Sequence, residues 1–214
     1  MHIPQASIAE QVVLPFAEAL ASANDRQNPY DTEKWLYVPP CYGDYRYLLG
    51  TRGKRPLICI GINPSTAAPD DLDNTLKSVE RIARGNGFDS WMMMNVYAQR
   101  ATRPDDMDRE VSPDLHRENM AAFEYLLQTA ESPAAIWAAW GAIIEKRAYL
   151  PTCVRDMVAI GKRYGATWLK AGKVSKVGHP HHPLYLKADS PVEPFDIEEY
   201  LDVLDAMNAA KRRK

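Results

Sequence analysis

Four short apolar runs divide the chain, and they constrain its fold more than any other feature. The clearest is Leu-Ile-Cys-Ile-Gly-Ile at residues 57–62, which follows Arg-Pro and precedes Asn-Pro. A run this short and this uniformly apolar indicates a strand that is buried on both faces, as in a parallel sheet. The four predicted strands cover residues 57–62, 91–96, 134–140 and 166–170.

The segments between these runs have the residue spacing of amphipathic helices. Within residues 70–86, for example, Leu72, Leu76, Val79 and Ala83 fall on one stripe. Helices are expected over residues 7–23, 70–86, 116–130, 141–149, 153–164 and 195–210. Alternating strands and helices predict an α/β fold, namely a three-layer α/β/α sandwich with a four-stranded, mainly parallel sheet.

A length of 214 residues favours a single domain. Its core is expected over residues 44–186, after an N-terminal helix and loop at 1–43 and before the C-terminal helix at 195–210. Residues 24–45 are expected to form a loop, and residues 45–49 a short strand. The apolar runs are too short to cross a bilayer and no secretory signal is visible, so we expect a cytoplasmic protein without a membrane partner.

The charge balance disfavours a strongly basic nucleic-acid-binding domain. The chain carries 26 Lys and Arg residues against 28 Asp and Glu residues, which gives a formal net charge of −2. Such domains typically have a pI above about 9. The obvious basic cluster is the Lys-Arg-Arg-Lys tail at residues 211–214, which is either a solvated terminus or an auxiliary phosphate contact.

Polar residues follow the first two predicted strands. In parallel sheets the carboxyl ends of the strands share one edge, and ligands bind there. Asn63 and Ser65 come after the first strand and either cap the turn or face a ligand. Asn95 ends the second strand. Its amide either bonds a neighbouring loop or reads a nucleobase edge, which needs a donor and an acceptor together.

The other two strand ends carry a glycine and a histidine-rich loop. At Trp140-Gly141, either the chain makes an ordinary turn or a helix begins that offers its N–H groups to an anion. Residues 178–183 read Gly-His-Pro-His-His-Pro without a carboxylate or thiolate at ligand spacing, so we expect neither metal nor cofactor. His179 or His182 is instead a candidate donor to a developing anion, the alternative being a solvated polar loop.

These segments resemble the DUF1643 family of bacteria and phages over roughly residues 44–186. The resemblance rests on five motifs in the family's order. They are Tyr-Arg-Tyr-Leu-Leu from residue 45, Gly-Ile-Asn-Pro-Ser-Thr-Ala from 61, Asn-Val-Tyr-Ala-Gln-Arg-Ala-Thr from 95, Ala-Ala-Trp-Gly from 138 and His-Pro-Leu-Tyr-Leu from 182. The family name implies no activity.

Four of the segments are also similar, more distantly, to motifs of the uracil-DNA glycosylase superfamily. Gly-Ile-Asn-Pro resembles the motif of the mismatch-specific uracil/thymine branch, where the Asn, here Asn63, positions the attacking water. The strand that ends at Asn95 resembles the one whose Asn reads the uracil edge, and Trp-Gly at 140–141 resembles the end of the third strand. The fourth segment, His-Pro-His-His-Pro-Leu from residue 179, resembles the motif whose His stabilises the base anion. It has one residue more than that motif, so either His179 or His182 could take the position of this His.

The second resemblance implies a uracil-DNA-glycosylase-like fold and hydrolysis at the N-glycosidic bond of a pyrimidine, possibly modified, in DNA or in a nucleotide. Asn63, with His182 or His179, would be catalytic. Tyr97 is the candidate for stacking on the base, and Arg100 a candidate for holding phosphate. The expected substrate-binding residues are Ser65, Asn95, Tyr97, Arg100, Trp140 and Gly141.

Two other functions stay open at this point. One is a protein that binds a nucleotide or modified base without cleaving it, and the other is a small-molecule enzyme that reuses the same cleft. The fold does not choose among them, because one fold supports many chemistries.

Overall fold

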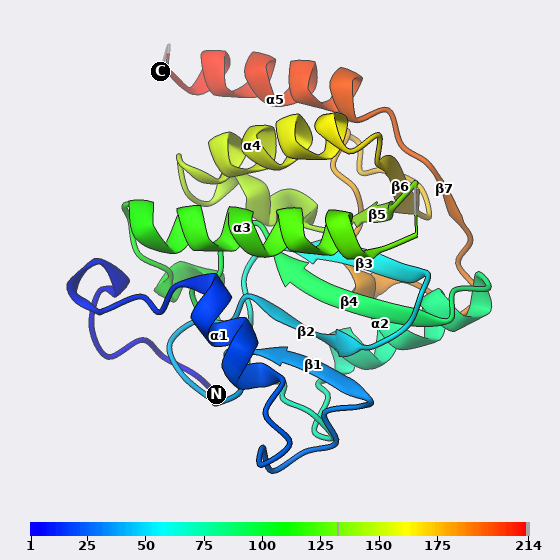
Figure 1. Cartoon of the computed structure of the whole chain (residues 1–214). Helices are drawn as coiled ribbons and strands as arrows, with labels where there is room; N and C mark the ends of the chain where they lie inside the picture. Colours follow the sequence, from blue (N-terminus) through cyan, green and yellow to red (C-terminus); the bar gives the residue numbers. More distant parts are fainter. Residues whose placement is uncertain (132, 213–214) are drawn as a thin grey trace.

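The computed structural model describes residues 1–131 and 133–212 as one mixed α/β structure (Figure 1). Its sheet has seven strands in the order β1-β2-β4-β3-β5-β6-β7. The strands are β1 (Trp35–Val38), β2 (Leu48–Thr51), β3 (Pro56–Gly61), β4 (Ser90–Asn95), β5 (Ala135–Ala138), β6 (Thr167–Ala171) and β7 (Val192–Pro194). The α-helices of the described residues are α1 (Phe16–Ala23), α2 (Asn74–Gly85), α3 (Pro113–Thr129), α4 (Leu150–Arg163) and α5 (Ile197–Arg212). The side chains of the basic tail lie outside the described part.

The middle of the sheet is parallel, and it consists of the four predicted strands. β4, β3, β5 and β6 lie side by side, and Gly61 of β3 pairs with Asn95 of β4. The expectation of a four-stranded sheet is wrong, since β1, β2 and β7 extend it with antiparallel pairs. β1 lies inside the predicted loop at 24–45, where its four residues are flanked by turn-forming Asn, Asp and Pro.

Helices cover both faces of the sheet. Successive residues of β4 point to opposite faces, so Met92 and Met94 contribute to one apolar cluster while Trp91 and Met93 contribute to the other. The first cluster is completed by α1, α3, α4 and α5, and the second by α2. Figure 1 shows α1, α3, α4 and α5 on one side of the sheet and α2 on the other. Because the helices cover the two faces of the sheet, loops cover the ends of its central parallel strands.

Two helix predictions differ from the structure because of proline and glycine. The N-terminal α-helix starts at Phe16, directly after Pro15, instead of at residue 7. The expected helix at 141–149 is a short 3₁₀ helix, η3 (Gly141–Glu145), and α4 begins only at Leu150. Pro151 lacks the N–H that a continuous helix would need, and it is well suited to a first helical turn. No α-helix in residues 1–131 and 133–212 is long and apolar enough to cross a membrane.

Candidate functional site

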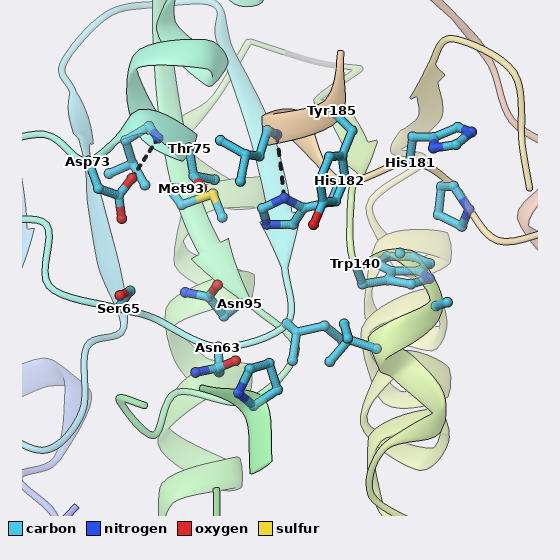
Figure 2. A pocket seen from close by; sticks show the side chains of 18 of the residues that line it. Asn63, Ser65, Asp73, Thr75, Met93, Asn95, Trp140, His181, His182 and Tyr185 are labelled. Atoms are coloured by element: carbon cyan, nitrogen blue, oxygen red, sulfur yellow. Dashed lines mark hydrogen bonds between the residues drawn. The ribbon is translucent and has the colours of Figure 1, made fainter. Parts of the chain in front are cut away.

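A cavity of about 710 Å³ lies at the carboxyl edge of the parallel strands. Its volume is in the range of sites for small organic ligands. The wall is assembled from the ends of all four parallel strands and from the start of α2. Figure 2 shows side chains from these segments around one open space. Of the expected site residues, the cavity is lined by Asn63, Ser65, Asn95, Trp140, Gly141, His179 and His182.

Asn95 is the buried amide of this cavity. Its side chain is fully buried, yet neither Nδ2 nor Oδ1 has a hydrogen-bond partner in the described residues. The backbone around it is fixed, because Asn119 of α3 donates from Nδ2 to the Asn95 carbonyl over 2.9 Å. Gly61 leaves space beside it, since a Cβ there would lie 3.0 Å from Oδ1 of Asn95. An unpaired buried amide is costly, which suits a group that is completed by a ligand.

Asn63 follows β3 and has one side of its amide occupied. Its Nδ2 donates to the carbonyl of Ala101 over 2.6 Å and to that of Pro64 over 3.2 Å. Two acceptors on the same atom fix the orientation of the amide. Oδ1 is therefore the atom that this half-buried side chain offers to the cavity, as an acceptor. Ser65 stands beside it, with its Oγ 3.5 Å from Oγ1 of Thr102.

His182 lies on the loop after β6 and caps the 3₁₀ helix η4 (Pro183–Tyr185). Its Nδ1 accepts a long hydrogen bond of 3.4 Å from the backbone N–H of Leu184. Burial lowers the pKa of the imidazole from its ordinary value, against the opposing effect of the Asp73 carboxylate. The ring is therefore neutral at pH 7, and because Nδ1 is the acceptor, Nε2 carries the proton.

His179 lies on the same loop in a closed hydrogen-bond network. Its Nε2 is 2.9 Å from Oε1 of Glu145, and its Nδ1 is 3.0 Å from the hydroxyl of Tyr200. The oxygen of the Tyr200 hydroxyl accepts from Nε1 of Trp140 over 2.8 Å. Both ring nitrogens of His179 are thus engaged within the protein. The network ties the loop to α5. Of the two expected histidines, it leaves His182 as the one that can serve a ligand.

Gly141 shapes the cavity through its backbone. It has a φ of +62°, which glycine adopts without strain, and its Cα carries no side chain toward His182, whose Cβ would be 3.7 Å from a Cβ at Gly141. The helix that begins here is the five-residue 3₁₀ helix η3. The expected anion site at an α-helix N-terminus is therefore absent at this position, and glycine is needed here for its positive φ, since a Cβ would make only an ordinary contact with the histidine loop.

Two expected binding residues do not line the cavity. Tyr97 is fully buried, packs 4.9 Å from the ring of Tyr149 and accepts from the Ser112 N–H over 2.9 Å. Arg100 is also fully buried, with Nη2 donating to the hydroxyl of Tyr37 over 2.9 Å. Both follow β4 closely, but the chain turns their side chains into the core behind the cavity wall. This placement removes Tyr97 as a stacking platform and Arg100 as a direct phosphate contact.

Sequence reasoning missed several residues of this region, among them Arg46 and Asp73, which line the cavity, and Asn119, which holds the backbone of Asn95. Only Arg46 carried a usable signal, as a charged residue inside the otherwise hydrophobic and aromatic motif Tyr-Arg-Tyr-Leu-Leu. Among the residues that the structure describes, no cluster of His, Cys, Asp or Glu is placed to hold a metal ion.

The fold and cavity define an α/β protein with room for a small ligand at the carboxyl edge of a mixed sheet. The family model described as "Protein of unknown function (DUF1643)" matches residues 46–184, which is well over half of the chain. The chain belongs to this family. No curated protein and no solved structure matches it.

Proposed function

We propose that the protein hydrolyses the N-glycosidic bond of a pyrimidine, possibly modified, in DNA or in a nucleotide, with a fold like that of the uracil-DNA glycosylases. The observation that carries the proposal is the buried amide of Asn95, whose donor and acceptor both lack a partner in the described residues. A uracil or thymine edge presents a carbonyl acceptor beside an imide donor. Such an edge would satisfy both atoms of the amide at once.

Asn63 is proposed to hold the attacking water. Its Nδ2 is bound to the Ala101 and Pro64 carbonyls, and its Oδ1 is left to accept from a water. An amide does not take a proton, so Asn63 acts by position and not as a base. A water held close to the anomeric carbon of the sugar reacts faster, because proximity and orientation lower the activation barrier substantially when the geometry is right.

His182 is proposed to stabilise the departing base. The water oxygen bonds to the anomeric carbon, and the electron pair of the broken C–N bond leaves with the base. The resulting negative charge spreads onto the base carbonyl, where a neutral Nε2–H donates a hydrogen bond. The water's extra proton is lost to solvent or to the base. Burial favours the neutral imidazole by lowering the pKa of His182, and a donor aimed at developing charge acts mainly in the transition state.

A second function, binding without cleavage, is favoured by one observation. Asp73 is the one carboxylate among the described residues that line the cavity, and its Oδ1 accepts from the backbone N–H of Leu76 as the cap of α2. The cavity thus lacks a carboxylate dedicated to activating water. A protein that only recognises a nucleotide or a modified base would need the Asn95 amide but no such group.

The test is release of free base from labelled single- and double-stranded oligonucleotides and from nucleotides that carry uracil, mismatched thymine or hydroxymethylated pyrimidines. The Asn95→Asp variant is expected to lose release or change its base preference, because a carboxylate cannot donate to a base carbonyl. Asn24→Asp, at an exposed amide on the far end of α1, is the matched control. Saturable binding of a base or nucleotide without release overturns hydrolysis in favour of recognition, and no binding at all overturns both.

A further inference from the structure

Two buried arginines lie at one end of the cavity, where Arg46 lines the wall and Arg100 lies behind it. Arg46 precedes β2 and is 1% exposed, while Arg100 follows β4 and is fully buried. Their guanidinium groups meet at one carbonyl, that of Ala67, which accepts from Nη1 of Arg46 over 3.0 Å and from Nη1 of Arg100 over 3.5 Å. Two buried cations at one neutral acceptor repel each other, and burial of unpaired charge is expensive.

Arg100 is held by several neutral groups, although its Nε, like that of Arg46, is buried without a partner in the described residues. It donates to the Tyr37 hydroxyl and to the carbonyl of Ser65, and its guanidinium lies 4.3 Å from the ring centre of Tyr42. These contacts hold the group in place without cancelling its charge. Arg100 therefore adds positive potential behind the cavity wall while contributing no contact to the cavity itself.

Arg46 is the arginine that reaches the cavity, and it is poorly satisfied. The group has five N–H donors, and the Ala67 carbonyl is the acceptor that the described residues provide. Its Nε is buried without a partner. Burial, and next the charge of Arg100, lower the pKa of Arg46 to about 9, which still leaves the group charged at neutral pH. The cavity therefore contains a cation with unused donors.

The wall beside Arg46 supplies further donors. Asn74 and Thr75 open the twelve-residue helix α2 at the cavity wall, where the first N–H groups of a helix have no partner within it. Asp73 brings a negative charge to the same wall, but no ion pair joins it to Arg46 in the described residues, and its carboxylate caps α2. Guanidinium and helix N-terminus together suit an oxyanion with several acceptor oxygens.

We propose that the Arg46 end of the cavity is an anion subsite that takes a phosphate group of a small ligand, with Arg100 as a positioning residue behind it. This inference goes beyond the proposed function, because it concerns charge recognition and stands whether or not a bond is cleaved. Combined with the Asn95 amide on the same cavity, it defines a nucleoside monophosphate as the fitting class of ligand. It also replaces Arg100 with Arg46 as the direct phosphate contact.

The experiment is a titration of the protein with inorganic phosphate, and with acetate and uridine as comparison ligands. Binding is measured by calorimetry and by the shift of the ¹⁵N-¹H signal of the Arg46 Nε–H. Phosphate is expected to bind saturably and to move this signal in the wild-type protein. Arg46→Gln is expected to weaken binding on the order of tenfold or more, since hydrogen bonds to charged groups are strong ones. Arg46→Lys restores part of the affinity, and Arg26→Gln, at an exposed pair with Glu33, leaves it unchanged.

The wild-type signal keeps the test decisive if Arg46→Gln fails to fold. Any one of three outcomes overturns the subsite. These are an Arg46 signal that does not change at saturating phosphate, equal phosphate affinity of the wild type and Arg46→Gln, and a response to acetate but not to phosphate. The wild-type protein is expected to bind uridine monophosphate more tightly than uridine, and Arg46→Gln is expected to bind the two ligands with equal affinity. Because Asn95→Asp changes the base contact and leaves the phosphate response intact, failure of the base-reading function is distinguished from failure of this subsite.

Discussion

The two histidines of the loop after β6 lie three residues apart and have opposite environments. His179 is 1% exposed, and both of its ring nitrogens are engaged by Glu145 and Tyr200. His182 is half-buried at the cavity, and its single described hydrogen bond is the 3.4 Å contact from the Leu184 N–H. The first ring is part of the structure that holds the loop, and the second ring is held by that loop.

The difference shows how a buried polar network separates support from chemistry. Through Tyr200, the His179 network reaches Trp140, whose indole N–H donates to the same hydroxyl. Since α5 carries Tyr200, this network fixes the loop against α5 and leaves His182 facing the cavity. Both residues are histidines followed by proline, so the sequence does not separate them, and burial and the satisfaction of their nitrogens do.

The largest expected effect comes from removing the free histidine. His182→Ala is expected to lower the rate of base release by roughly 10²–10³, because a lost donor to a developing anion costs about that much. Ligand affinity is expected to change little. The measurement is single-turnover release together with equilibrium binding, and His116→Ala, which removes a histidine paired with Asp156 between α3 and α4, is the control. A His182→Ala protein with wild-type rates would remove this residue from the mechanism.

Removing the engaged histidine is expected to affect folding instead. His179→Ala removes the buried imidazole from its contacts with Tyr200 and Glu145, which is expected to cost roughly 2–4 kcal/mol in the free energy of unfolding. His182→Ala is expected to cost less than about 1 kcal/mol, since the bond it loses is long. Urea unfolding of both variants measures the difference, and His116→Ala reports the loss of a surface pair. Equal losses at positions 179 and 182 would contradict the division of roles.

The central strands could be predicted because burial on both faces leaves a signature in the sequence. β3 and β4 match their apolar runs to within one residue at each end. The edge strands could not be predicted in the same way. β1 has four residues and β7 has three, and β7 is partly exposed, so neither produces a long apolar run.

For the cavity, strand ends were a good guide and side-chain direction was not. Asn63 and Asn95 reach the cavity because parallel strands end at one edge. Tyr97 and Arg100 are only two and five residues past β4, yet they turn into the core. Arg46 reaches the cavity because β2 is antiparallel to β4, so the residues that precede β2 lie beside the carboxyl end of β4. That pairing joins distant segments and has no local pattern.

The smallest expected effect is the pH dependence of stability, and it tests the environment of His182 directly. Burial lowers the pKa of His182 in the folded protein below its ordinary value of 6.5. Between these two pKa values the unfolded chain binds more protons than the folded protein, so stability rises with pH. The contribution from neutral His182 is therefore complete above about pH 6.5, the pKa expected for the unfolded chain, and is lost as the pH falls below it.

The free energy of unfolding of the wild type is accordingly expected to fall more steeply between about pH 7 and 5 than that of His182→Gln. His2, whose pKa is also lowered mainly by burial, is present in both proteins and cancels in the difference. Urea unfolding at a series of pH values measures the two curves. Parallel curves would mean that His182 titrates alike in the folded and unfolded chains, and its contrast with His179 would then rest on hydrogen bonding alone.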